Sequence, residues 1–283
     1  MQVIYDYSHK KVADYLLTGC KALIDFPHGL GDDVMFMPLL LKMRELYPQS
    51  EIDVKWADGR LDVFPQPKAT DYYDYVFKIT FYETPTDPRF RAYSKPECCC
   101  VKELGIPFDL GMDFTWQPPK FDSPFIGVSL MCNSNSSYNI PYNVGKQVWS
   151  AVQQCGMIPI EIYFHHPQFN NQNKPYDFVN CSTRGVKPSV EAFSAALQSL
   201  RGFVGVNSGT LCMASAMYPS RVLHLHNRYP FIYYRKRPIN FISADGCSQF
   251  NMDEMLKWVE CIKSKRQYVM PNSDPKNPIG FIS

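Results

Sequence analysis

The chain has 283 residues, and its 45% hydrophobic content is enough to bury one large core or two smaller ones. The 29 Lys and Arg residues nearly balance the 27 Asp and Glu residues, so the formal net charge is only +2. A dedicated nucleic-acid binder usually shows a larger basic excess, although a local basic face can hide within a balanced total. No apolar run approaches the roughly 20 residues of a membrane helix, and the first residues do not look like a signal peptide. We therefore expect a soluble, cytoplasmic protein.

The ten cysteines are expected to be reduced, because they are spread through a long chain and lack Cys-x-x-Cys spacing. The adjacent Cys98, Cys99 and Cys100 offer poor geometry for zinc, and the pair His165 and His166 has no third ligand nearby in the sequence. We therefore expect no metal and no other cofactor.

The first clear structural signature lies between residues 22 and 54. A short apolar run at 22–24 is typical of a strand buried on both faces, and residues 34–46 are long enough for a helix. A second strand is predicted at 51–54, so the stretch forms a βαβ unit. Between the first strand and the helix, Gly29 and Gly31 allow either a positive φ or the close approach of a ligand to the backbone.

Two carboxylates, Asp32 and Asp33, stand at the start of this helix, where unpaired N–H groups and the positive end of the helix dipole lie. Acidic residues at such a place either complement the dipole or perform chemistry at a ligand site. The residues alone leave both interpretations open.

A proline-rich stretch at 116–124 suggests a domain boundary. We expect an N-terminal domain at 1–120 and a C-terminal domain at 121–283, with a polar tail from about residue 266. The second half alternates strands with helices, which predicts an α/β fold with parallel, doubly wound sheets. The predicted elements are strands at 125–130, 158–164, 203–206 and 222–226 and helices at 146–154, 190–199 and 252–262.

A second glycine motif follows the predicted strand at 203–206. Asn207 or Ser208 is a good helix cap, and Gly209 with the small residues 214–216 lets a helix begin close to a ligand. Such a helix start suits a diphosphate, which backbone N–H groups and the hydroxyls of Ser208 and Thr210 would bind. The alternative is a simple N-cap without any ligand.

Basic and aromatic residues are interleaved between residues 227 and 238, where Arg228, Tyr229, Arg235, Lys236 and Arg237 occur. Tyrosines can stack on a base while arginines contact phosphate, on a nucleotide or along a nucleic-acid strand. The alternative is a solvated loop with a few packed rings.

Both glycine motifs resemble signatures of glycosyltransferase family 9, the heptosyltransferase family. The run Gly29-Leu30-Gly31-Asp32 with its apolar helix is similar to the family's opening, and residues 207–212 resemble its Asp-Ser-Gly-x-x-His motif. The resemblance implies a GT-B fold, in which two Rossmann-like domains face a central cleft. The chain lacks the Asp-x-Asp motif with which the other large glycosyltransferase fold holds its metal, which favours a metal-independent enzyme.

The resemblance implies an inverting transfer in which Asp32 is the general base and Asp33 is a dipole or solvent residue. The residues that would bind the donor's phosphates and sugar are Asn207, Ser208, Gly209, Thr210 and Cys212. Asn207 replaces the family's Asp and Cys212 replaces its His, so the donor sugar stays open.

The family also tends to have a lysine before the first helix of its second domain, which residues 136–143 lack. We therefore expect the phosphate-neutralising cation from Arg228, Arg235, Lys236 or Arg237.

Three functions remain open at this level. The acceptor is a saccharide or lipid-linked saccharide, or it is a hydroxymethylated base in DNA, or the chain is an inactive nucleotide- or sugar-binding module. Tyr72, Tyr73 and Tyr75 either line an acceptor cleft or belong to the core, and the core is the interpretation we favour.

Overall fold

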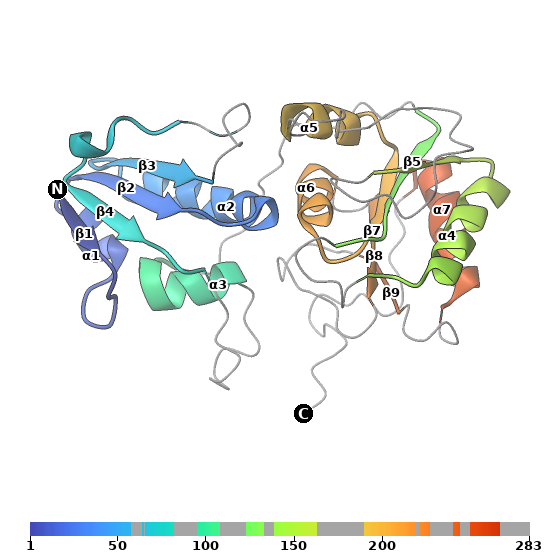
Figure 1. Cartoon of the computed structure of the whole chain (residues 1–283), viewed down its shortest axis with the longest axis horizontal. Coiled ribbons are helices and arrows are strands. Elements are labelled where there is room, and N and C mark those ends of the chain that lie inside the picture. Colours follow the sequence, from blue (N-terminus) through green and yellow to red (C-terminus); the bar gives the residue numbers. More distant parts are fainter. Residues whose placement is uncertain are drawn as a thin grey trace. The chain divides into compact units, whose positions relative to one another are not determined.

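The computed structural model describes residues 1–57, 64, 66–81, 95–107, 123–132, 139–162, 190–218, 221–226, 240–243 and 250–266. The chain divides into two compact units (Figure 1), Met1–Phe114 with Tyr233–Arg235 and Thr115–Ile232 with Lys236–Ser283. The expected boundary at residue 120 stays a prediction, because residues 108–122 lie outside the described residues.

Unit 1 contains a four-stranded sheet in the order β1-β4-β2-β3, with every neighbouring pair parallel. Its elements are β1 (Gln2–Ile4), α1 (Val12–Leu16), β2 (Lys21–Phe26), α2 (Leu30–Leu46), β3 (Glu51–Trp56), η1 (Thr70–Tyr72), β4 (Tyr75–Lys78), α3 (Lys95–Cys99) and the π-helical turn η3 (Cys100–Leu104). The chain runs from β2 outward to β3 and then returns to β4 on the other side of β2. Strand order therefore reverses between β2 and β4.

Helices α1 and α2 pack against the same face of this sheet. Phe26 of β2 stacks on Phe36 of α2 with ring centroids 4.3 Å apart, and Tyr15 of α1 meets Phe77 of β4 at 5.3 Å. Ile24 is the partner of Phe77 in the register between β2 and β4, and it shares a face with Phe26 because side chains alternate along a strand. The connections from β1 to β2 and from β2 to β3 advance in the same direction across the sheet. Because connections between parallel strands are right-handed, both connecting helices lie on the same face.

The opposite face of the sheet carries a mixture of apolar and charged side chains. Leu23 and Val76 pack there with Tyr73, whose side chain is buried. Asp25 of β2 forms an ion pair with Lys78 of β4, its partner in the register. Of the three tyrosines expected in the core, Tyr73 is buried there, whereas Tyr72 and Tyr75 are only partly buried.

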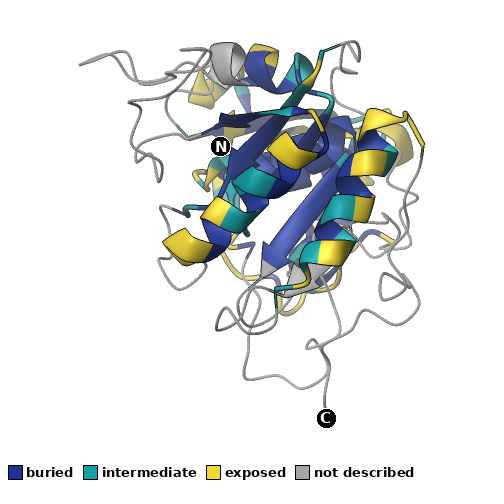
Figure 2. Ribbon diagram, turned by 90° about the vertical axis from the view of Figure 1, so that its right-hand side faces the viewer, coloured by how far each residue is buried: buried dark blue, intermediate teal, exposed yellow. Residues whose placement is uncertain are grey.

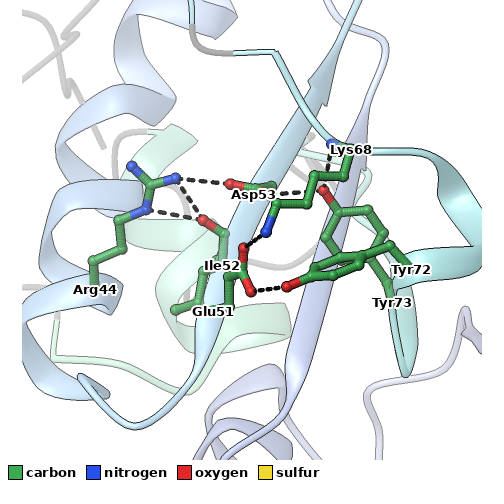
Figure 3. A network of polar contacts seen from close by, with 7 residues as sticks. All are labelled: Arg44, Glu51, Ile52, Asp53, Lys68, Tyr72 and Tyr73. Carbon is green, nitrogen blue, oxygen red and sulfur yellow. Dashed lines mark hydrogen bonds and ion pairs between the residues drawn. The ribbon is translucent and has the colours of Figure 1, made fainter.

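Strand β3 forms one edge of the sheet, and a side chain of α2 covers it. The Arg44 guanidinium donates to the Ile52 carbonyl from Nε at 2.9 Å and from Nη2 at 2.6 Å, and Nη2 also lies 3.2 Å from Asp53 Oδ1 (Figure 3). An open edge strand presents unpaired backbone groups that invite aggregation. Arg44 therefore protects this edge.

The connection from β3 to β4 is fixed to the same strand by a second set of contacts (Figure 3). Tyr73 donates its hydroxyl to Asp53 at 2.7 Å, while the Lys68 ammonium and the Tyr72 hydroxyl both donate to Glu51. These two bonds lower the pKa of Glu51 below its usual value. The network holds the η1 turn against β3.

Unit 2 contains a five-stranded, wholly parallel sheet in the order β6-β5-β7-β8-β9. Its elements are β5 (Phe125–Ser129), α4 (Tyr142–Gln154), β6 (Ile158–Glu161), α5 (Val190–Gln198), β7 (Gly202–Gly205), α6 (Gly209–Met217), β8 (Val222–His226), β9 (Asn240–Ser243) and α7 (Met252–Lys263). Strand order reverses between β5 and β7, because β6 lies on the far side of β5.

Helices cover both faces of this second sheet. On one face, α4 and α7 bury apolar side chains such as Val148 and Trp258 against Val128 and Val204, and their exposed residues point outward (Figure 2). Helices α5 and α6 lie on the other side (Figure 1). The parallel α/β fold expected from the sequence is confirmed, and unit 2 is doubly wound in the strict sense.

Several element bounds differ from the expectations. Helix α2 begins at Leu30 rather than at residue 34, and α4 begins at Tyr142 rather than at residue 146. The early start of α2 follows from Gly29 acting as its N-cap. Asp32 and Asp33 consequently belong to the first turn of the helix itself.

Candidate active site

The candidate catalytic residue, Asp32, lies in the first turn of α2, directly after the carboxyl end of β2. Gly29 precedes it as the N-cap residue with φ −72° and ψ 158°, so the first of the two alternatives, a positive φ, does not apply to Gly29. A Cβ atom placed on Gly29 would meet, among the described atoms, only Asp32 Oδ2, at 3.6 Å. The fold would accept a side chain at Gly29, and glycine is also a favourable N-cap residue, so the close approach of a ligand stays a prediction.

Asp32 also lies at the point where strand order reverses in the first sheet. Ligands of open parallel sheets bind at such switch points, outside the carboxyl ends of the strands. His28 connects the two strands there, because its Nε2 forms a 3.0 Å hydrogen bond with the Ile79 carbonyl just after β4. Its ring packs on Phe26 with centroids 4.2 Å apart. The turn that holds Asp32 is thus fixed to the neighbouring strand.

Lys95 is the charged partner of Asp32, and sequence reasoning did not identify it. The Lys95 ammonium lies 2.9 Å from Asp32 Oδ1, and the two side chains are 21% and 19% exposed. Lys95 begins α3, in a part of the sequence without a recognisable motif. Only the tertiary structure brings it to Asp32, so no local sequence signal could have revealed it.

The segment that follows Lys95 is anchored to the end of β4 by a buried carboxylate. Glu103 Oε1 accepts hydrogen bonds from the Thr80 amide at 2.9 Å and from the Thr80 hydroxyl at 2.6 Å. Gly105 ends the π-helical turn in the left-handed region with φ 69°. This anchoring holds Lys95 near the carboxyl ends of the strands, where Asp32 also lies.

The cysteines between Lys95 and Glu103 are structural. Cys98, Cys99 and Cys100 are all buried, and burial raises the pKa of Cys100 to about 12 and that of Cys99 well above its usual value. The thiols of Cys99 and Cys100 therefore stay neutral near pH 7, whereas a nucleophilic cysteine needs its thiolate form. The described cysteines are thiols rather than disulfides, as the sequence predicted.

Asp33 differs from the expectation that it is a dipole or solvent residue. Its exposed fraction is 0%, so the solvent interpretation is wrong. Its position in the first turn of α2 still places it near the positive end of the helix dipole.

The second glycine motif lies at the corresponding place in unit 2, after β7 and at the reversal between β5 and β7. Ser208 is the N-cap of α6, and its Oγ accepts from the Leu211 amide at 3.3 Å and donates to the Val206 carbonyl at 3.0 Å. The hydroxyl therefore works as a helix cap. The amides of Gly209 and Thr210, at the first two helical positions, have no acceptor within the helix.

Exposure separates the expected donor-binding residues into two groups. Asn207, Ser208 and Gly209 are partly exposed, whereas Thr210 and Cys212 are buried, with exposed fractions of 8% and 2%. A ligand at the start of α6 would thus meet the first group and the backbone. The contact expected from the Cys212 side chain stays a prediction.

Several expected contributors fall outside the described residues. These are Arg228, Tyr229, Arg235, Lys236 and Arg237, the segment 133–138, and the pair His165 and His166. Within the described part of the chain, no group of three or more His, Cys, Asp or Glu side chains could hold a metal ion. No helix in that part has the length and apolar character needed to cross a membrane.

No protein-family model matches the chain, and no curated protein matches it in sequence. Among solved structures, the dodecameric iron-containing heptosyltransferase TibC in complex with ADP-D-β-D-heptose is similar with a TM-score of 0.54 and 15% identity, over 86% of this chain and 73% of that one. A second TibC structure, from enterotoxigenic E. coli H10407, matches with a TM-score of 0.50 and 17% identity over 73% of this chain, which spans only 60% of that chain.

Two further structures extend this likeness. The glycosyltransferase family 9 protein from Veillonella parvula DSM 2008 has a TM-score of 0.53 at 13% identity, over 89% of this chain and 91% of that one. The E. coli heptosyltransferase WaaC with ADP-2-deoxy-2-fluoro heptose has a TM-score of 0.53 at 13% identity, over 85% and 99%. At such identities the likeness shows the fold, which is the GT-B type of the family 9 glycosyltransferases, and the expected fold class is confirmed.

Proposed function

We propose that this chain is a cytoplasmic, inverting glycosyltransferase that moves a sugar from a nucleotide-sugar donor to an acceptor hydroxyl without a metal ion. The observation that supports this most directly is the position of Asp32. Its carboxylate stands beside the exposed Gly29, at the switch point of a parallel sheet, in a chain with the fold of family 9 glycosyltransferases.

In this proposal, Asp32 acts as the general base of a single displacement. Its carboxylate takes the proton of the acceptor hydroxyl while the acceptor oxygen bonds to the anomeric carbon. The bond from that carbon to the donor's diphosphate oxygen breaks at the same time, and its electron pair leaves with the nucleoside diphosphate. Attack opposite to the leaving group inverts the anomeric centre.

The start of α6 would stabilise the diphosphate that leaves. The amides of Gly209 and Thr210 lie at the positive end of the helix dipole, which favours a negative charge there. Asn207 and the basic residues at 228–237 would add polar contacts and positive charge. The negative charge that develops on the leaving diphosphate would then be stabilised by fixed hydrogen-bond donors rather than by a metal ion.

The donor is tested first by thermal shift with UDP, ADP, GDP and CMP and their sugar conjugates, on the native protein and on Gly209→Trp. A ligand that binds only the folded state raises the melting temperature by mass action. One nucleotide class should stabilise the native protein and not Gly209→Trp. If none stabilises the folded protein, the transferase proposal fails.

Turnover assays with that donor then test the finer points. Saccharide, lipid-linked saccharide and hydroxymethylated DNA acceptors are compared, and the anomeric configuration of the product is read by NMR. TibC is described as iron-containing, so the assays are repeated with chelator and with added Fe(II). Transfer that survives chelation, with an inverted product, supports the proposal; a requirement for iron would contradict its metal-free part.

A further inference from the structure

The two oxygens of the Asp32 carboxylate have different surroundings. Oδ1 accepts from the Lys95 ammonium at 2.9 Å, whereas Oδ2 lies beside Gly29, 3.6 Å from the place that a Cβ atom would occupy. Gly29 is exposed, so Oδ2 lies next to accessible backbone without a side chain. One oxygen is thus held by the protein and the other borders the place where a ligand can approach.

Lys95 is well suited to fix the carboxylate. Only 21% of the Lys95 side chain is exposed. A partly buried ion pair keeps a single geometry better than a fully exposed surface pair does. Its segment is fixed in turn, because Glu103 accepts two hydrogen bonds from Thr80 at the end of β4. The lysine and the carboxylate are therefore attached to adjacent strands of the same sheet.

We propose that Lys95 is a positioning residue for the general base. It fixes Asp32 through Oδ1 so that Oδ2 faces the exposed backbone at Gly29 and takes the acceptor proton. This inference rests on the proposed function. In this proposal, Oδ1 binds Lys95 and sets the orientation of the carboxylate, while Oδ2 accepts the proton. Catalytic bases are generally oriented by a third group in this way. A carboxylate free to rotate would spend less time in the productive geometry, which lowers the rate of the chemical step.

The kinetic test uses Lys95→Met, Lys95→Arg and a control on the same helix as Asp32. Lys42→Met is the control, because Lys42 forms an ion pair of nearly the same length, 2.8 Å, with Glu45 elsewhere on α2. Lys95→Met should lower kcat by about tenfold to a hundredfold. Donor affinity, measured by calorimetry, should change by less than about twofold, because Lys95 touches the base and not the donor.

Lys95→Arg should recover most of the rate, since a guanidinium can donate to the same oxygen, and Lys42→Met should leave kcat unchanged. Weakened donor binding with an unchanged kcat in Lys95→Met would overturn the proposal, because Lys95 would then be a donor-binding residue. An unchanged kcat and an unchanged donor affinity would overturn it as well.

An unfolding measurement separates failure of this inference from failure of the proposed function. Asp32→Asn, Lys95→Met and the double variant are unfolded in urea, which needs no substrate. The two single effects should be non-additive, because the partners interact directly. Additive effects would overturn the pairing even in an active enzyme. If the two effects on unfolding are non-additive but the protein transfers no sugar, the interaction between Asp32 and Lys95 is real. Its catalytic role is then rejected together with the proposed function.

Discussion

The two units place their candidate sites at equivalent points of their sheets but build them from different chemistry. In unit 1 the site consists of charged side chains, Asp32 and Lys95, at the reversal between β2 and β4. In unit 2 it consists of the start of α6, where Ser208 caps the helix and the backbone amides of the first turn have no acceptor within the helix. A side-chain site can be disabled by an isosteric substitution, whereas a backbone site must be obstructed sterically. The following predictions use this difference, beginning with the largest effect.

Asp32→Asn should reduce kcat by about a hundredfold to ten-thousandfold, because the amide cannot accept the acceptor proton. Steady-state kinetics with the donor found by thermal shift measures this. The control is Asp253→Asn, since Asp253 also lies in the first turn of a helix, α7, and is exposed. If both variants lose activity equally, or if neither does, Asp32 serves only the helix dipole.

Gly209→Trp should weaken the binding of the donor nucleotide by tenfold or more, because each lost charge-assisted hydrogen bond costs about 1.5–3 kcal/mol. Calorimetric titration with the nucleoside diphosphate checks this. Asn251→Ala is the matched control: it removes the side-chain cap of α7 and should lower stability by about 1 kcal/mol while donor binding persists. Equal donor affinity in Gly209→Trp and the native protein would place the diphosphate elsewhere.

Two glycines give a further contrast between the units. A Cβ atom on Gly127 in β5 would lie 2.5 Å from Leu200 Cδ1 and 2.9 Å from Phe203 Cδ2, so Gly127→Ala should cost about 1–3 kcal/mol of unfolding free energy through overpacking. Gly29→Ala, which replaces a favourable N-cap residue, should cost no more than about 1 kcal/mol and still lower kcat/KM. Urea unfolding and kinetics on the two variants measure the contrast. A large stability loss in Gly29→Ala would mean that this glycine serves packing, not a ligand.

The smallest predicted effect concerns Tyr73, on the face of the first sheet that lies opposite α1 and α2. Burial, and then the hydrogen bond to Asp53, raise the pKa of Tyr73 to about 12 from the usual 10. A raised pKa of an acidic group means that its contribution to stability is complete below pH 10 and is lost as pH rises from 10 to 12. The stability difference between the native protein and Tyr73→Phe should therefore be constant below pH 10 and shrink above it.

Urea unfolding at a series of pH values from 8 to 11.5 measures this difference. Tyr5→Phe provides the control, because Tyr5 is 70% exposed. A difference between native protein and Tyr73→Phe that stays constant through pH 11.5 would show that the phenol ionises without cost in the folded state.

Periodicity and glycine motifs predicted those elements whose signal is local. The strands β2 and β7 follow from short apolar runs that lead into glycine turns, and the helix α2 follows from the long apolar run after the first of these turns. The alternation in unit 2 predicted parallel strands because helices must connect them. Elements with weak local signals, such as β1, α1, β4 and β9, were not predicted, since strands of three or four residues acquire their stability from neighbours rather than from their own sequence.

The candidate site divides in the same way. Asp32, Gly29 and Ser208 belong to local glycine motifs, so the sequence was sufficient to select them as candidates, and their roles stay predictions. Lys95 has no such context, because its relation to Asp32 depends on how α3 returns to the end of β2. The burial of Asp33 was also beyond local reasoning, since the pattern of one helix does not reveal which of two adjacent acidic residues turns inward.

The register of β1 has a consequence for how the chain is made. Gln2 is paired with Tyr75, so β1 obtains its partner strand β4 only after β2 and β3 have been synthesised. β2 and β3, which are joined by one helix, can pair earlier because the loop between them is shorter. We therefore expect unit 1 to assemble from β2 and β3 outward, with β1 joining last. A tag attached at Met1 would then act on the final step of assembly.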